Sequence, residues 1–203
     1  MSADVIDGGS LDLHRTAVLP MDLQAGVVSA YVKDPSFLPR TVHLLDDVRA
    51  VHVPIIYVKV ALRPGVPEAS PRNRFLSAVK ASPVHQRFFQ HECGDIHAAL
   101  APQDDDLIVA KGHISSFAGT DLDLLLRAKD VSTIVLFGIT TSGVVLSTTL
   151  QAIDLDYRVI VVEDCCVDDD LDMHACIVRK ILKPFATVAS ARDVALALAA
   201  SRS

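Results

Sequence analysis

The sequence predicts a three-layer α/β/α domain built on a six-stranded, mostly parallel sheet. Short β-branched runs that are apolar on both faces alternate with longer segments whose apolar residues recur at helical spacing. Hydrophobic residues make up 50% of the 203-residue chain and charged residues 22%, a balance that excludes a disordered chain. The length suits one domain over residues 1–203, and we expect residues 1–13 to be a flexible N-terminal segment.

The predicted elements follow one another in the order that a parallel sheet requires. A helix over residues 39–51 is expected because Val42, Leu45 and Val48 share one face. Residues 61–103, rich in Pro, His and Arg, are expected to form one long irregular segment, which in a compact domain is usually functional. The strands are expected over residues 15–21, 54–60, 106–110, 132–138, 158–162 and 185–189, and the other helices over residues 121–129, 142–155, 171–182 and 191–200.

The ends of the predicted strands indicate where a site would lie. Parallel sheets bind ligands at the carboxyl ends of their strands. In this chain those positions are Asp22, the residues after Val60, Lys111 and the segment Gly138–Gly143. We therefore expect these scattered residues to meet at one edge of the sheet.

Charge and hydropathy exclude several classes of function. Lys and Arg number 19 against 25 Asp and Glu, so the net charge of -6 provides no basic footprint for nucleic acid. No apolar run approaches the ~20 residues needed to cross a bilayer. The first ten residues show no signal-peptide pattern, so we expect a cytoplasmic protein, with unconventional export left open. The four cysteines include no Cys-x-x-Cys pair, and we expect reduced structural thiols.

Three stretches carry a family likeness. They are Val-Leu-Pro-Met-Asp-Leu-Gln at residues 18–24, Lys-Gly-His-Ile-Ser-Ser-Phe-Ala-Gly-Thr at 111–120, and Gly-Ile-Thr-Thr-Ser-Gly-Val-Val-Leu-Ser-Thr at 138–148. In order and spacing they resemble the isochorismatase-like hydrolase family, over roughly residue 15 to the last helix. Three motifs in register are specific for that superfamily, whereas each alone is weak. The resemblance implies the three-layer fold and a hydrolase that needs neither an organic cofactor nor a metal.

One position departs from the pattern of most family members, which are cysteine hydrolases with an Asp–Lys–Cys triad. By resemblance Asp22 matches the acid and Lys111 the lysine, but the nucleophile position is Gly143. Glycine has no side chain, so it cannot form a covalent intermediate. The vinyl-ether hydrolases of the family, which cleave isochorismate and release pyruvate, are similar in carrying glycine there.

The likeness to vinyl-ether hydrolases implies a role for each of these residues. Asp22 would be the general acid, with a pKa raised by burial, that protonates the terminal carbon of the vinyl ether. Lys111 would hold a substrate carboxylate or carbonyl and position Asp22, while Gly143 would leave room for substrate. Vinyl-ether hydrolases carry a glutamine near the end of the second strand, where this chain has Val60. Either the substrate differs from isochorismate, or another polar group takes the place of this glutamine.

The expected substrate is a small carboxylated anion, isochorismate or a relative. Residues 59–80 contain five basic side chains and one acid, which would attract carboxylates. From that segment we favour Arg63 and Arg74 as ligand-facing residues. We also predict a cis peptide bond between Ile139 and Thr140. The remaining predicted substrate-binding residues are Gln24, Phe117, Ile139, Thr140 and Thr141.

Other interpretations stay open. The chain could be a hydrolase of the same fold that acts on an amide or another bond, or a binding or regulatory protein in which Gly143 marks a lost nucleophile. Cys165 and Cys166 are expected to be buried, and the acids of residues 168–172 to begin a helix. His85, His91 and His97 are expected at the surface or in packing rather than at a metal. Apolar helices over residues 142–155 and 171–182 favour a homo-oligomer, either a dimer or a tetramer.

Overall fold

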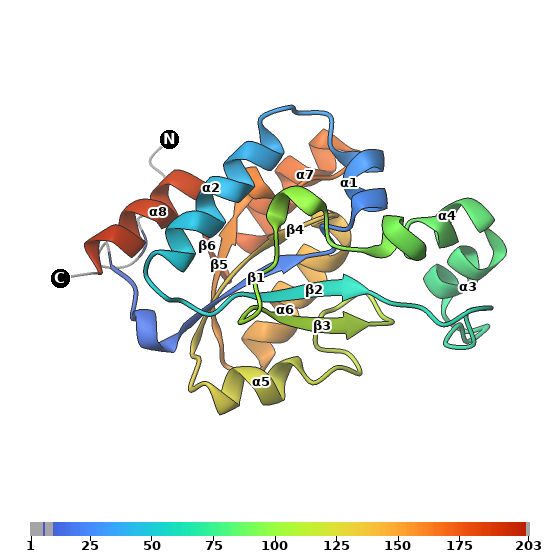
Figure 1. The fold of residues 1–203 in the computed structure, drawn as a ribbon, viewed down its shortest axis with the longest axis horizontal. Coiled ribbons are helices and arrows are strands. Elements are labelled where there is room, and N and C mark those ends of the chain that lie inside the picture. The colour runs from blue at the N-terminus through green and yellow to red at the C-terminus, as the bar shows by residue number, and fades with distance from the viewer. Residues whose placement is uncertain (1–5, 7–9, 202–203) are drawn as a thin grey trace.

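The computed structural model describes residue 6 and residues 10–201 of the chain. One sheet with strand order β3-β2-β1-β4-β5-β6 runs through it, and every strand pairing is parallel (Figure 1). The predicted three-layer fold is thereby confirmed. The strands are β1 (Thr16–Met21), β2 (Ile56–Val60), β3 (Leu107–Lys111), β4 (Thr133–Gly138), β5 (Arg158–Val162) and β6 (Thr187–Ala189).

The helices cover both faces of the sheet. Figure 1 shows α2 and α8 together on one side and α5 and α6 on the other. The central strands β1 and β4 are buried throughout, which explains why their sequences are apolar on both faces. The helices are α1 (Ala25–Tyr31), α2 (Phe37–Arg49), α3 (Arg74–Ala81), α4 (Pro83–Arg87), α5 (Leu122–Ala128), α6 (Leu146–Asp154), α7 (Leu171–Cys176) and α8 (Ala191–Ala200).

Two predicted helices contain a change of helical type. The helix expected over residues 142–155 consists of a π-helical turn at Thr141–Val145 followed by α6. The helix expected over residues 171–182 consists of α7 followed by a π-helical segment at Ile177–Leu182. Hydrophobic spacing detects such segments as helical but does not resolve the local widening, which is set by tertiary contacts.

The expectation of an irregular segment over residues 61–103 is wrong. That stretch contains α3 and α4, followed by 3-10 turns at His91–Gly94 and Ala98–Leu100. The Asn73 side chain accepts a hydrogen bond from the Leu76 N–H and caps α3, while Ser82 caps α4 directly before Pro83. An Asn cap and a Ser-Pro start are helix signals that the unusual composition of the segment obscured.

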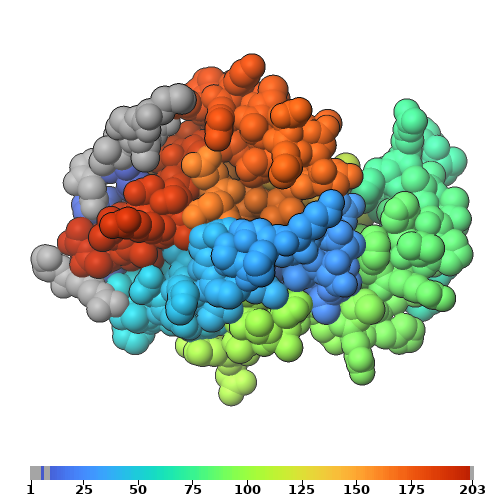
Figure 2. Space-filling model, turned by 90° about the horizontal axis from the view of Figure 1, so that it is seen from above, coloured from blue at the N-terminus to red at the C-terminus, as the bar shows by residue number. Residues whose placement is uncertain are grey.

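Residues 61–94, termed the arm below, leave the sheet at the carboxyl end of β2. In Figure 1 the arm extends beyond the strand ends, and in Figure 2 it forms a separate lobe at one end of the molecule. The Gln24 side chain joins both ends of the arm, because its Nε2 donates to the carbonyls of Val60 (3.0 Å) and Gly94 (2.8 Å). Its Oε1 accepts from the Val60 N–H at 2.8 Å. One buried amide therefore fixes where the arm begins and ends.

The N-terminal segment is packed where the structure describes it. Ile6 and Leu11 are buried in the core, and the Leu11 N–H donates to Ser201 Oγ at 2.7 Å. Residues 10–13 are therefore attached to the domain, contrary to the expected flexibility, while residues 1–5 and 7–9 lie outside the described part.

Large apolar side chains lie exposed on the later helices, as the expected oligomer would require. They include Leu150, Leu171, Met173 and Ile181. The homo-oligomer stays a prediction. Within residues 6 and 10–201, no helix has the length and apolar character to cross a membrane.

We expect Gly138→Ala, at the end of β4, to lower the free energy of unfolding by about 2–3 kcal/mol. A Cβ atom there would overlap the backbone oxygen of Met21, and the φ angle of +154° is one that side chains rarely adopt. Gly65→Ala is the control, since its φ is +75° but no atom lies within 4 Å of the added Cβ. Only the backbone cost of about 1 kcal/mol applies at Gly65. If urea denaturation shows the same loss of unfolding free energy for Gly138→Ala and Gly65→Ala, the steric explanation is contradicted.

Candidate active site

An ion pair between Asp22 and Lys111 lies at the carboxyl edge of the sheet. Asp22 directly follows β1 and Lys111 is the last residue of β3, so the parallel topology brings them together across β2. Lys111 Nζ lies 2.8 Å from Asp22 Oδ2, and both side chains are buried. The two residues that the sequence placed at strand ends are thus in direct contact.

The Asp22 carboxyl differs from an ordinary surface acid in three ways. Burial raises the pKa of this carboxyl from its ordinary value of 3.8, and the nearby Lys111 only partly opposes that rise. Oδ1 is buried and has no hydrogen-bond partner among the described residues. Asp22 also has a φ of +55°, an uncommon value for a residue with a side chain. A strained backbone, a raised pKa and an unpartnered oxygen together are typical of a functional acid.

The Lys111 ammonium is already fully engaged within the protein. Besides Asp22 Oδ2, it donates to the carbonyls of His113 (3.1 Å) and Ile114 (2.7 Å). An ammonium has three protons, so these three acceptors use all of them. The expectation that Lys111 holds a substrate carboxylate does not fit this geometry, whereas its role in positioning Asp22 does.

Gly143 faces the same space from the turn that follows β4. Its N–H donates to Thr140 Oγ1 at 3.1 Å, and a Cβ atom at position 143 would lie 2.7 Å from that same oxygen. The Thr140 hydroxyl therefore occupies space that a larger residue at 143 would need. The Ile139–Thr140 peptide bond is cis, as predicted.

Asp168 anchors this turn from the loop after β5. Its Oδ2 accepts from the Ser142 N–H at 2.7 Å, and the Thr141 N–H donates to the Val167 carbonyl at 2.9 Å. Burial tends to raise the pKa of the Asp168 carboxyl, but the hydrogen bonds from Ser142 prevail and lower it. The first acid of residues 168–172 is thus part of the support for the site. Asp170 begins α7 as expected, since its side chain accepts from Asp172 N and Met173 N.

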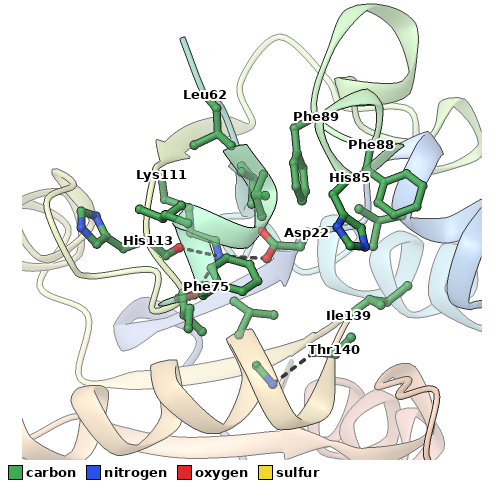
Figure 3. A pocket seen from close by; sticks show the side chains of 18 of the residues that line it. Asp22, Leu62, Phe75, His85, Phe88, Phe89, Lys111, His113, Ile139 and Thr140 are labelled. Atoms are coloured by element: carbon green, nitrogen blue, oxygen red, sulfur yellow. Dashed lines mark hydrogen bonds and ion pairs between the residues drawn. The ribbon is translucent and has the colours of Figure 1, made fainter. Parts of the chain in front are cut away.

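A cavity of about 360 Å³ opens onto these groups (Figure 3). Asp22 and Lys111 lie on its floor with Ile139, Thr140 and Gly143, and side chains of the arm form the opposite wall. The volume lies in the lower part of the range typical of small-molecule sites. The arm residues that line it include Phe75, Leu76, Val79, His85, Phe88 and Phe89.

Several predicted binding residues lie elsewhere. Arg63 is exposed and pairs with Glu68 at 2.7 Å, and Arg74 is exposed on α3. Gln24 is buried at the base of the arm, where all its amide contacts are to backbone. The Phe117 ring stacks on Tyr157, with 6.0 Å between centroids, and Thr141 Oγ1 lies 2.8 Å from His174 Nδ1. None of these five is among the residues found along the cavity.

The cysteines provide no nucleophile at the cavity. Cys165 and Cys166 are buried as expected, and Cys93 and Cys176 are exposed. Burial raises the pKa of the Cys165 thiol to about 12 and also raises that of Cys166. Both thiols are therefore protonated and unreactive at neutral pH. Across the described ranges, no three His, Cys, Asp or Glu side chains cluster closely enough to hold a metal ion.

The sequence interpretation missed the aromatic wall of the cavity. Phe75, Phe88 and Phe89 belong to the segment expected to be irregular, and Tyr31 belongs to α1, a helix not predicted. The buried residues Leu76 and Val79 share one face of α3, and that spacing was a readable signal. Recognising this helix would have shown that residues 61–94 contribute apolar surface as well as charge.

The comparisons with known proteins agree with this fold. The isochorismatase domain model matches residues 16–193. An uncharacterized isochorismatase family protein of Escherichia coli O157:H7, YecD, is 30% identical over 93% of this chain and 98% of its own. The ureidoacrylate amidohydrolase RutB of Agrobacterium fabrum is 29% identical over 76% of this chain and 77% of its own. A solved isochorismatase family protein from Burkholderia thailandensis superposes with a TM-score of 0.82 at 30% identity, covering 94% of this chain and 98% of that one.

Proposed function

The chain belongs to the isochorismatase family of hydrolases, and we propose that it hydrolyses an enol (vinyl) ether by proton donation from Asp22. This proposal is supported most directly by Asp22 Oδ1, which is buried on the floor of the cavity and has no hydrogen-bond partner among residues 6 and 10–201. Gly143, at the position where most family members have their nucleophile, borders the same cavity. An enol ether is cleaved by acid without a covalent nucleophile, so it suits a site that offers one acid and no thiol. Isochorismate is the reference compound that the family implies.

The reaction would start with transfer of the Asp22 proton to the terminal carbon of the enol ether. The resulting oxocarbenium ion adds water, and the hemiketal so formed breaks down to a carbonyl compound and an alcohol. Water returns one proton overall, which restores neutral Asp22. Lys111, 2.8 Å from Oδ2, stabilises the carboxylate that exists between these two proton transfers.

Gly143 and the apolar wall of the cavity determine the surroundings of Asp22. Gly143 borders the cavity and presents no side chain, so a substrate beside Asp22 meets no thiol where most family members have one. Apolar residues around Asp22 keep bulk water away and so keep its pKa high enough for proton donation. The same surroundings would disfavour an ionised Asp22 that activates water, which an amide hydrolase without cysteine would need.

The test is a substrate panel assayed with purified protein. It contains enol ethers, isochorismate among them with pyruvate as readout, and the amides ureidoacrylate and maleamate, whose hydrolysis names two relatives. We expect turnover of at least one enol ether and no substrate adduct in intact-protein mass spectra. The Cys93→Ser, Cys176→Ser double variant is the control and should keep full activity. Turnover confined to amides, or a trapped adduct, would reject the proposal.

A further inference from the structure

We infer that the cavity accepts a substrate whose body is an apolar ring or chain with at most one anionic group. This inference names the substrate class and rests on the proposed function for the bond that is cleaved. It departs from the expectation of a dianion such as isochorismate. Three features of the described residues support it: the chemistry of the lining, the engagement of the nearby cations and the exposed aromatic surface of the arm.

The lining is mostly aliphatic and aromatic. The arm contributes Phe75, Leu76, Val79 and the Phe88–Phe89 pair, and the body contributes Ile139 and Val144. Phe88 and Phe89 meet edge to face, with 6.4 Å between ring centroids. Figure 3 shows the Phe75 and Phe89 rings near Asp22, with the Phe88 ring farther out beyond His85. A substrate body seated here would exchange water for hydrocarbon contacts over much of its surface.

The basic side chains that could bind two carboxylates either are bonded to acceptors of the protein or lie away from the cavity. Lys111 has three protein acceptors, which are Asp22 Oδ2 and the carbonyls of His113 and Ile114. Arg63 pairs with Glu68, and neither Arg63 nor Arg74 lies along the cavity. A dicarboxylate would therefore bring in negative charge beside Asp22 without new partners, which is costly in an apolar site.

One titratable group on the arm could accept a single anion. His85 on α4 lines the cavity, and Figure 3 shows its ring on the same side as Asp22, next to Phe88. His113 also borders the cavity, but its ring is directed away from Asp22 in that view. The ring N–H of one imidazole can donate one hydrogen bond to a carboxylate, so a neutral or monoanionic substrate fits.

Phe75 carries accessible apolar surface beside the cavity. Its side chain is 47% exposed although it borders the cavity. Its neighbours Leu76 and Val79 are buried within the arm, so α3 is held in place independently of Phe75. Phe75 is thus the residue to change when testing the ligand class, because its loss removes apolar contact and leaves the arm intact.

The experiment measures binding of three matched ethers to the wild-type protein by calorimetry. The probes are ethoxybenzene, 4-ethoxybenzoate and 4-ethoxyphthalate, which carry zero, one and two carboxylates and are not enol ethers. We expect one of the first two to bind tightest, and 4-ethoxyphthalate to bind at least about tenfold more weakly than either. The corresponding vinyl ethers, assayed for turnover, test the proposed function separately from binding.

Two variants assign the preference to the cavity. Phe75→Ala should weaken binding of ethoxybenzene about tenfold, because it removes an aromatic contact. Phe185→Ala is the control, since Phe185 is 56% exposed but does not border the cavity, and it should leave binding unchanged. Phe75→Arg should reduce the difference in binding affinity between 4-ethoxyphthalate and ethoxybenzene, because it supplies a cation that can pair with a carboxylate.

The outcomes separate the two proposals. Tightest binding by 4-ethoxyphthalate, no binding by any probe, or no effect of Phe75→Ala overturns the inference about substrate class. The expected order of binding with no turnover of any vinyl ether supports the apolar ligand class and rejects the proposed bond chemistry.

Discussion

Asp22→Asn is expected to lower kcat/KM for an enol ether by about 10²–10⁴-fold, the usual contribution of a positioned general acid. Asparagine keeps the size of the side chain, and its carbonyl oxygen can still accept a hydrogen bond from Lys111. It cannot supply a proton of comparable acidity at Oδ1. The measurement is steady-state turnover by wild-type and variant protein, together with thermal unfolding to establish that both are folded.

The dependence of kcat/KM on pH shows whether Asp22 acts as an acid or as a base. Burial raises the pKa of Asp22, and the acid must be protonated to act. Wild-type kcat/KM should therefore be highest below that pKa and fall as the pH rises through it. A rate that instead rises over this range would assign Asp22 the role of a base. Residual activity above a tenth of wild type in Asp22→Asn would remove it as the acid.

Lys111→Met is expected to lower the free energy of unfolding by about 3–5 kcal/mol at pH values where Asp22 is ionised, because it then leaves a buried carboxylate without its partner. Lys111 lowers the pKa of Asp22, so its removal raises that pKa further. A carboxyl whose pKa is higher in the folded than in the unfolded state destabilises the fold when it is ionised, and this cost disappears when the carboxyl is protonated. The loss of stability should therefore shrink as the pH falls below the new Asp22 pKa and the carboxyl becomes neutral.

The control for Lys111→Met is Lys59→Met, which breaks an ion pair at the surface. Lys59 Nζ lies 3.2 Å from Asp95 Oδ1, and the Asp95 side chain is 71% exposed. Such a pair contributes about 0–1 kcal/mol, so little change is expected. The activity of Lys111→Met adds a second check. The pH at which its kcat/KM falls should be higher than for the wild-type protein, because the Asp22 pKa is higher. A loss of stability that is the same at every pH would contradict the coupling between the two residues.

The sequence was sufficient for the sheet and for the acid–lysine pair. Both depend on regularities that local sequence expresses: apolar runs mark buried strands, and parallel topology brings Asp22 and Lys111 to one edge. The cis bond at Ile139–Thr140 was also predicted, from the family resemblance. These predictions needed the parallel arrangement of the strands but not the direction of any long side chain.

The wall of the cavity could not be predicted in the same way. Charge counting in residues 59–80 favoured Arg63 and Arg74, but how α3 packs decides which of its side chains meet the cavity. Leu76 and Val79 turn inward, Phe75 borders the cavity, and Arg74 is left in solvent. Gln24 shows the same limit, because contacts with Val60 and Gly94, 36 and 70 residues away, decide its role.

The clamp that Gln24 makes on both ends of the arm has an evolutionary consequence. Because the chain leaves and rejoins the domain at one amide, lengthening or shortening the intervening segment changes the closure entropy only slightly. The sheet edge that carries Asp22 and Lys111 is independent of that length. Relatives could therefore exchange this insert as a cassette and acquire new substrates while the reaction chemistry beneath it stays the same.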